Sequence, residues 1–159
     1  MLSASIPELP EIDDSMSAIA SYLQTNLNDR IAQISPDVVA VRSTACYNSL
    51  PRDLSSFPLL KVYRTTDTFT LTGNLTQAVV GYCFSFPDEE RIPGILRWVA
   101  LQVNFLLREW AIAHKECSPR IEYNEEFRAE YRVMTFNSEP LYSLLQFNFQ
   151  LMEDNLWLG

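Results

Sequence analysis

Residues 77–116 read QAVVGYCFSFPDEERIPGILRWVALQVNFLLREWAIAHKE, and this stretch decides the fold. It opens with a β-type run from Ala78 to Phe86, passes through a short acidic turn, and continues as a helical pattern from Pro93 to about Lys115. Apolar side chains recur in the helical part at spacings of three and four residues, which is the period of one helix face. The stretch therefore predicts a strand and a helix that packs on a sheet.

The predicted helix carries a second apolar flank, made of Ile95, Trp98, Phe105 and Ile112. A water-exposed helix that is apolar on two sides must be covered on more than one side. We therefore predict that Trp98 and Phe105 contact a neighbouring subunit. Charged and amide side chains within residues 92–113 argue against a membrane span.

The residues before this stretch predict an arm, a helix and a strand. Residues 1–13 contain two prolines and read as an extended arm. Asp14 or Ser15 is a favourable N-cap for an amphipathic helix that runs to about Gln33. The β-branched residues 38–42 then predict a short strand.

Two loops and a hairpin are predicted in the next part of the chain. Residues 45–57 have no clean period and read as a long loop, and the Thr-rich residues 66–76 read as a second. Residues 58–65 predict a strand that pairs with residues 78–86. In the latter strand the large side chains alternate with small ones, and we expect the helix to approach the small face.

The C-terminal part of the chain predicts an antiparallel hairpin. Residues 127–133 alternate strictly between apolar and charged side chains, and residues 145–152 alternate between apolar and amide side chains. Residues 137–140 form the turn signal between them. The last six residues, 154–159, read as a tail with an apolar Leu-Trp-Leu segment.

These elements predict one α+β domain over residues 14–153, preceded by the arm and followed by the tail. The expected architecture is a single twisted mixed sheet of about five strands with two helices packed on one face. A chain of 159 residues is long enough to bury one such core.

The charge and the cysteines bound the function. The net charge is -8 and no Lys/Arg run is present, so sequence-independent binding to DNA or RNA is not expected. The three cysteines, Cys46, Cys83 and Cys117, are odd in number and far apart, which predicts isolated buried thiols in a reducing compartment.

No catalytic, cofactor or metal motif is found. His114 is the only histidine, and its place at a helix end predicts a cation that interacts favourably with the helix dipole. Residues 88–90 are acidic, and they read as a first helical turn rather than a cation site. The four glycines cannot form a phosphate-binding loop. We therefore expect no enzymatic activity, no cofactor and no metal.

The order of elements resembles the tail terminator (tail completion) proteins of long-tailed bacteriophages. The resemblance spans about residues 15–153 and includes residues 57–65, which read FPLLKVYRT, and the acidic turn into the long helix. It implies a non-enzymatic virion protein of the neck, assembled in the host cytoplasm. Such proteins form a hexameric ring that caps the tail tube, stops its polymerisation and joins it to the head-completion proteins. DNA would pass through the ring without specific binding, and a sheath protein is a further possible partner.

Two other functions remain open from the residues alone. The chain is compatible with another neck component, such as a head-closure or adaptor protein. It is also compatible with a small monomeric or dimeric α+β domain that binds a ligand or catalyses a reaction. The residues that we predict to contact partners or neighbouring subunits lie in the two loops, in the strand between them, on the long helix and in the tail: Arg52, Asp53, Arg64, Asp67, Phe69, Trp98, Phe105, Leu156, Trp157 and Leu158.

Overall fold

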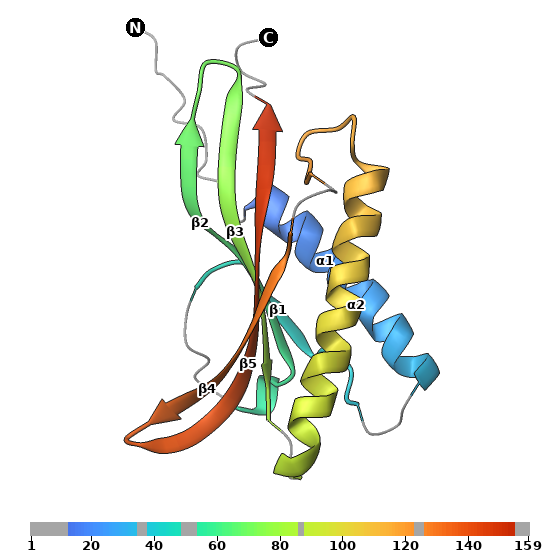
Figure 1. Cartoon of the computed structure of the whole chain (residues 1–159), viewed down its shortest axis with the longest axis vertical. Helices are drawn as coiled ribbons and strands as arrows, with labels where there is room; N and C mark the ends of the chain where they lie inside the picture. Colours follow the sequence, from blue (N-terminus) through green and yellow to red (C-terminus); the bar gives the residue numbers. More distant parts are fainter. Residues whose placement is uncertain (1–12, 35–37, 49–53, 86–87, 123–125, 155–159) are drawn as a thin grey trace, which may run out of the picture.

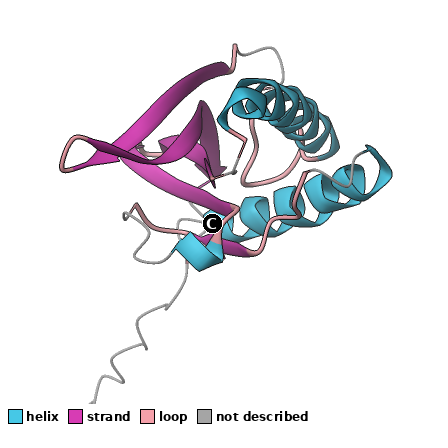
Figure 2. Cartoon of the chain, turned by 90° about the horizontal axis from the view of Figure 1, so that it is seen from below, coloured by secondary structure: helices cyan, strands magenta, loops and turns pink. Residues whose placement is uncertain are grey.

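The computed structural model describes residues 13–34, 38–48, 54–85, 88–122 and 126–154. These residues form one open five-stranded sheet and two long helices (Figure 1). When the molecule is viewed from below relative to Figure 1, both long helices lie on the same side of the sheet (Figure 2). The predicted fold class, α+β with a single mixed sheet, is confirmed.

The sheet has the strand order β1-β2-β3-β5-β4. Its strands are β1 (Ser43–Ala45), β2 (Leu59–Phe69), β3 (Gly73–Phe84), β4 (Arg128–Phe136) and β5 (Glu139–Asp154). β1 pairs with β2 in parallel, and all other neighbours are antiparallel. Short 3₁₀ turns, η1 (Leu54–Ser56) and η2 (Glu89–Arg91), precede β2 and the second long helix.

The helices are α1 (Asp14–Ile34) and α2 (Ile92–Ala113), close to their predicted bounds. The cap of α1 lies one residue earlier than predicted, because the Asp13 carboxylate accepts the N–H of Met16 at 3.3 Å. α2 begins with Pro93 in its first turn, where a missing N–H costs no helical hydrogen bond.

The main core lies between the two helices and the sheet. Every third or fourth residue of α1 from Met16 to Ile31 is buried against it. On β3 the large side chains Val80, Tyr82 and Phe84 face the helices. The expectation that a helix approaches the small face of this strand is therefore wrong. A packed core needs volume, and the large side chains supply it.

The small face of β3 is buried in a second, smaller cluster. Cys83 packs there with Phe57, Leu59, Tyr142 and Leu144. The rings of Phe57 and Tyr142 meet edge to face, with centroids 5.0 Å apart. The segment before β2 and the start of β5 thus cover the face of the sheet that carries no long helix.

The first predicted strand is misplaced. Residues 38–42 are irregular, and β1 begins at Ser43. The Asn28 side chain of α1 accepts the N–H of Val41 at 2.7 Å and donates to its C=O at 3.2 Å. A helix side chain thus satisfies the backbone groups that strand pairing would otherwise use.

The Thr-rich residues 66–76 are also not the predicted loop. β2 continues to Phe69 and β3 begins at Gly73, so most of this segment is a hairpin beyond the core. Thr side chains are β-branched and favour extended backbone, which accounts for the longer strands. A register shift between Arg64 and Thr66 marks a bulge in β2.

The predicted C-terminal hairpin is confirmed. β4 pairs with β5 around a turn at Asn137 and Ser138, which both have positive φ (51° and 67°). Two consecutive positive φ values define the turn that matches the twist of a tight hairpin. β5 has 16 residues and also pairs with β3 along its length, so it ties the hairpin to the centre of the sheet.

Candidate subunit-contact surfaces

The solvent-facing side of α2 carries a row of exposed apolar side chains. Leu101, Phe105 and Ile112 are 39%, 53% and 58% exposed. Their spacings of four and seven residues place them on one helix face, opposite the buried face of α2. We call these three residues the α2 stripe. An apolar row of this kind on a helix is typical of a protein–protein contact.

Trp98 lies at the inner margin of this face. Its side chain is half-buried and packs against the main core. It lines a shallow apolar hollow with Ile31, Ile34 and Val38 at the end of α1. Of the two predicted contact residues on α2, Phe105 is exposed, whereas Trp98 mainly joins the two helices.

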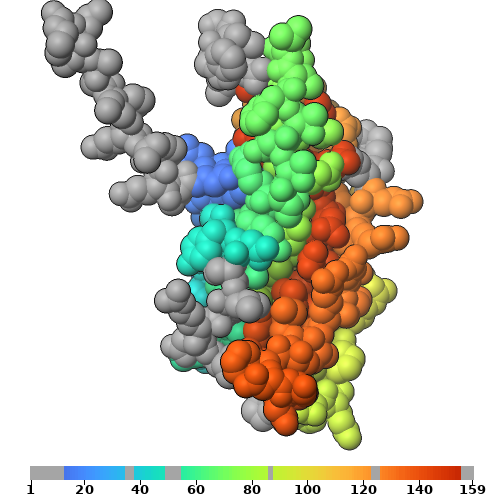
Figure 3. All heavy atoms as spheres, turned by 90° about the vertical axis from the view of Figure 1, so that its left-hand side faces the viewer, coloured from blue at the N-terminus to red at the C-terminus, as the bar shows by residue number. Residues whose placement is uncertain are grey.

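The β2–β3 hairpin ends in a second apolar surface. Phe69 is 77% exposed and Leu71 is 88% exposed, and we call them the hairpin tip. The turn is held by three hydrogen bonds between Thr70 and Gly73. The Thr70 N–H and hydroxyl donate to the Gly73 C=O at 2.8 and 2.9 Å, and the Gly73 N–H donates to the Thr70 hydroxyl at 3.1 Å. The tip is therefore a structured knob that projects at one end of the molecule (Figure 3).

A third apolar surface lies at the opposite end, between the start of α2 and β4 (Figure 1). Tyr131 and Val133 point to the helix side of the sheet, yet they are 48% and 62% exposed. Ile92, Pro93 and Leu96 form the other wall of a groove of about 540 Å³. We call it the α2–β4 groove. Its charged lining residues are the arginines Arg97 and Arg132.

Arg64 lies at the centre of a network within the chain. Its guanidinium donates to both oxygens of Asp13 (2.6 and 2.9 Å), to Asp67 (2.9 Å) and to Glu153 (2.9 Å). We call these four residues the Arg64 cluster. Three further polar side chains bond to its carboxylates: Ser15, Asn74 and Thr76. The cluster fastens the N-terminus of α1 to the end of the sheet that bears the hairpin.

The network holds all three carboxyl groups in their charged form. The hydrogen bond from Arg64 lowers the pKa of Asp13. Burial alone would raise the pKa values of Asp67 and Glu153, but hydrogen bonds from Arg64 and from neighbouring polar side chains lower both. The same bonds raise the pKa of Arg64, so the cluster carries two net negative charges.

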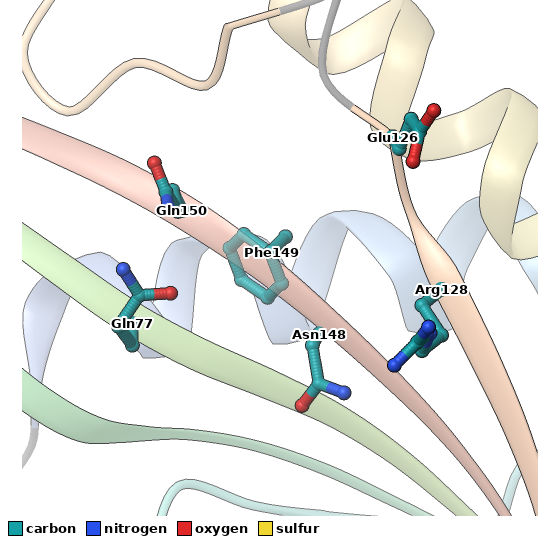
Figure 4. Close-up of a pocket in the computed structure, with 6 residues that line it drawn as sticks. All are labelled: Gln77, Glu126, Arg128, Asn148, Phe149 and Gln150. Atoms are coloured by element: carbon teal, nitrogen blue, oxygen red, sulfur yellow. The ribbon is translucent and has the colours of Figure 1, made fainter.

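A polar pocket lies where β5 extends past the start of β4 (Figure 4). Amide side chains from Gln77, Asn148 and Gln150 line it, together with Glu126 and Arg128. These groups donate and accept hydrogen bonds, but they include no Ser, Cys, His or Lys nucleophile.

His114 caps α2 and packs on its own helix. Its ring stacks on Trp110 with centroids 4.1 Å apart, and Nδ1 lies 2.9 Å from the Trp110 C=O. Within the described ranges, no group of three or more His, Cys, Asp or Glu side chains is placed to hold a metal ion. Neither of the helices there is long and apolar enough to cross a membrane.

The three cysteines are unpaired but not equally buried. Cys83 is buried, and burial raises the pKa of its thiol to about 11. Cys117 is exposed and Cys46 is only partly buried, so the prediction that all three thiols are buried holds for Cys83 alone. Cys117 lies in the turn region that follows α2, where apolar residues show no regular spacing in the sequence.

The predicted contact residues fall into four groups, one of which is Trp98 alone, a half-buried side chain that packs against the main core. Phe69 and Phe105 are exposed apolar side chains, as a contact requires. Arg64 and Asp67 bind each other within the Arg64 cluster. The other predicted residues, Arg52, Asp53, Leu156, Trp157 and Leu158, lie outside the described residues.

Sequence reasoning did not identify the α2–β4 groove or the exposure of Leu71 and Leu101. The alternation in β4 places Tyr131 and Val133 on the helix side of the sheet, where burial is the usual outcome. Only the three-dimensional structure shows that α2 leaves this part of β4 uncovered.

Comparison with known proteins does not add a family to this description. A scan against protein-family models gives no match, and a search of curated proteins gives none either. The function is therefore inferred from the sequence and the surfaces described above.

Proposed function

We propose that the chain is a ring-forming structural protein of a bacteriophage neck, a tail terminator that caps the tail tube and joins it to the head-completion proteins. The observation that carries the proposal is the α2 stripe. It gives the chain an apolar surface on the side of α2 that faces away from its own core. The order of elements supports the same class, since it resembles that of tail terminators.

The α2 stripe is costly to leave in water. Full burial of a large aliphatic or aromatic side chain contributes about 1.5–3 kcal/mol. Leu101, Phe105 and Ile112 are about half exposed, so their burial against a partner would contribute about 2–4 kcal/mol in all. A partner that covers this face therefore gains a useful part of its binding free energy from three side chains.

A ring places a further requirement on its subunit. Each copy contacts two neighbours through two different surfaces, and it also presents a face to the structures above and below. Three apolar surfaces are available for these contacts: the hairpin tip at one end of the molecule, the α2–β4 groove at the other, and the α2 stripe, which begins one turn after Arg97 of the groove (Figure 1). We assign the α2 stripe to the contact with the tail tube or with a head-completion protein.

The charge agrees with a passage for DNA. The chain carries a net charge of -8, which disfavours adhesion of a phosphate backbone. DNA could therefore slide through a ring of such subunits without being held.

The assay is the length of tail tubes assembled in the presence of the chain. The tube protein of the same virus is polymerised with and without the purified full chain, and tube lengths are measured by electron microscopy. Tubes that stop growing and carry a ring at one end support the proposal. Unchanged tube lengths and bare tube ends would contradict it.

A variant pair separates the α2 stripe from a general effect of charge. Phe105→Glu places a carboxylate in the middle of the stripe and should abolish capping. Gln102→Glu places the same charge on the adjacent side of α2, where Arg30 already bonds to Gln102 at 2.8 Å. This control should cap tubes normally, and equal loss in both variants would refute the role of the stripe.

A further inference from the structure

We propose that the hairpin tip of one copy of this chain docks in the α2–β4 groove of the next copy. The inference deepens the proposed ring, on which it rests, because it names the contact between neighbouring subunits. The occupant of the groove is thus a second copy of the same chain, and the docking segment is its β2–β3 hairpin.

The tip has the properties of a docking knob. Phe69 and Leu71 are among the most exposed large apolar side chains of the described residues, at 77% and 88%. The hydrogen bonds between Thr70 and Gly73 close the turn and restrict its backbone. A preorganised knob loses little conformational entropy when it binds.

The groove has the matching chemistry. One wall is the first turn and a half of α2, and the other is the exposed part of β4 around Tyr131 and Val133. The exposed surface of its lining is almost entirely apolar. An apolar knob and an apolar groove exclude water from each other, which neither can do alone.

The strand edges favour the same arrangement. Among the described strands, β4 is an outer strand and pairs only with β5. β1 pairs with β2 only at residues 59–61, so the outer edge of β2 from Val62 onward has no strand partner in the described sheet. A hairpin seated in the groove brings one outer edge beside another, which allows backbone pairing between copies.

The charges at the two ends are complementary. The Arg64 cluster at the hairpin end carries three carboxylates for one guanidinium. The groove is lined by Arg97 and Arg132 and by no acidic side chain. Because Arg132 is already paired with Glu130 at 2.6 Å, Arg97 carries most of this complementarity. Opposite charges around an apolar contact orient the partners and raise the rate of association.

The positions of tip and groove decide the type of assembly. The two surfaces lie at opposite ends of the molecule (Figure 1), so a tip does not reach the groove of its own chain. A contact between two different surfaces is heterologous, and it closes into a ring when the rotation between neighbours allows. The same geometry explains how every subunit can use both surfaces at once.

The test uses two variants of the full chain, each defective on one surface. Leu71→Glu removes the tip, and Val133→Glu removes the groove, and both positions are exposed, so the fold should persist by circular dichroism. The control is Thr68→Glu, which adds the same charge near the tip on an exposed position facing the other side of β2. Native mass spectrometry of each variant, alone and in mixtures, reads out the assemblies.

The expected results form a distinctive pattern. The wild type and Thr68→Glu assemble, whereas Leu71→Glu and Val133→Glu are monomers, with the contact weakened at least 100-fold. An equimolar mixture of the two defective variants gives a 1:1 dimer and nothing larger, because one intact tip still meets one intact groove. Only a heterologous tip-to-groove contact predicts this dimer.

Each other outcome contradicts either the tip-to-groove contact alone or the contact together with the proposed ring. If the wild type assembles and the two variants assemble equally well, the tip-to-groove contact is wrong while the ring remains. If the variants are monomers but their mixture gives no dimer, the tip and groove do not bind each other. If the wild type is itself a monomer and the mixture gives no dimer, both this contact and the proposed ring are refuted.

Discussion

The Arg64 cluster makes the sharpest quantitative prediction about the fold. Arg64→Met keeps the volume of the side chain and removes its charge, which leaves the carboxylates of Asp13, Asp67 and Glu153 facing one another. Removing one partner from a fully buried ion network costs about 3–5 kcal/mol. Arg64 and the three carboxylate side chains are each about one quarter exposed, at 22–26%. Screening by solvent reduces the expected loss to about 2–3 kcal/mol.

The assay is thermal and urea unfolding at pH 7, at equal protein concentration for every variant. A loss of this size lowers Tm by about 5–10 °C in a chain of this length. The matched control is Arg120→Met, which breaks one ion pair with the half-exposed Asp154 at 3.0 Å and a long hydrogen bond to the Cys117 C=O at 3.4 Å. Its expected cost is about 0.5 kcal/mol.

The stability loss caused by Arg64→Met should also depend on pH. The folded-state pKa values of Asp13, Asp67 and Glu153 are lowered, so their contribution to stability is present above their unfolded values near pH 4. It is lost as pH falls through the lower folded values. The difference between wild type and Arg64→Met should therefore shrink as the pH falls from 7 towards 3.

Two results would contradict this role of the Arg64 cluster in stability. One is a loss at pH 7 no larger than that of the Arg120→Met control. The other is a stability difference that stays constant with pH. A normal stability combined with failed assembly would instead assign Arg64 to a partner contact, as the sequence predicted.

Two further predictions concern residues whose surroundings differ. Gly73→Ala should destabilise the hairpin by about 1–3 kcal/mol, because the new Cβ would lie 2.6 Å from the Glu153 carbonyl oxygen. At Gly94 a Cβ meets no atom within 4 Å, so Gly94→Ala should stabilise α2 by about 0.5 kcal/mol. Urea unfolding measures both changes in stability, and equal effects of the two substitutions would contradict the hairpin geometry. Under native conditions a thiol reagent such as DTNB should label exposed Cys117 promptly, and it should reach buried Cys83 only after unfolding. Rapid native labelling of Cys83 would mean that the second apolar cluster is not formed.

The elements with strong periodicity were predictable from the sequence. The pattern of α2 places its helix within two residues of the observed bounds, and the alternation of β4 and β5 predicts their pairing. Both patterns arise because one face of each element is buried. The spacing of apolar residues in the sequence therefore matches the residue repeat of the helix or strand.

The failures have local physical causes. Residues 38–42 have strand composition, but the Asn28 side chain takes the hydrogen bonds of Val41. The segment 66–76 has a turn signal at Gly73, yet its β-branched threonines extend both strands of the hairpin. In the first case a long-range hydrogen bond determines the backbone conformation, and in the second the strand propensity of threonine does so; neither is recorded in the periodicity of apolar residues.

The candidate contact surfaces were predictable only in part. The second apolar flank of α2 identifies Phe105, because the spacing of apolar residues along the sequence shows that the helix is apolar on two sides. The Arg64 cluster joins residues that are 51 and 89 positions apart in the chain, and no local pattern connects them. The groove depends on where α2 begins relative to β4, which is a property of the packed structure.

The native mass of the full chain in solution distinguishes a ring from a monomer. Size-exclusion chromatography with light scattering, run over a range of concentrations, gives this mass without a partner protein. A ring of six copies of an 18.3 kDa chain has a mass of about 110 kDa, and we expect a stable species of this size. A single species near 18.3 kDa at every concentration would contradict it.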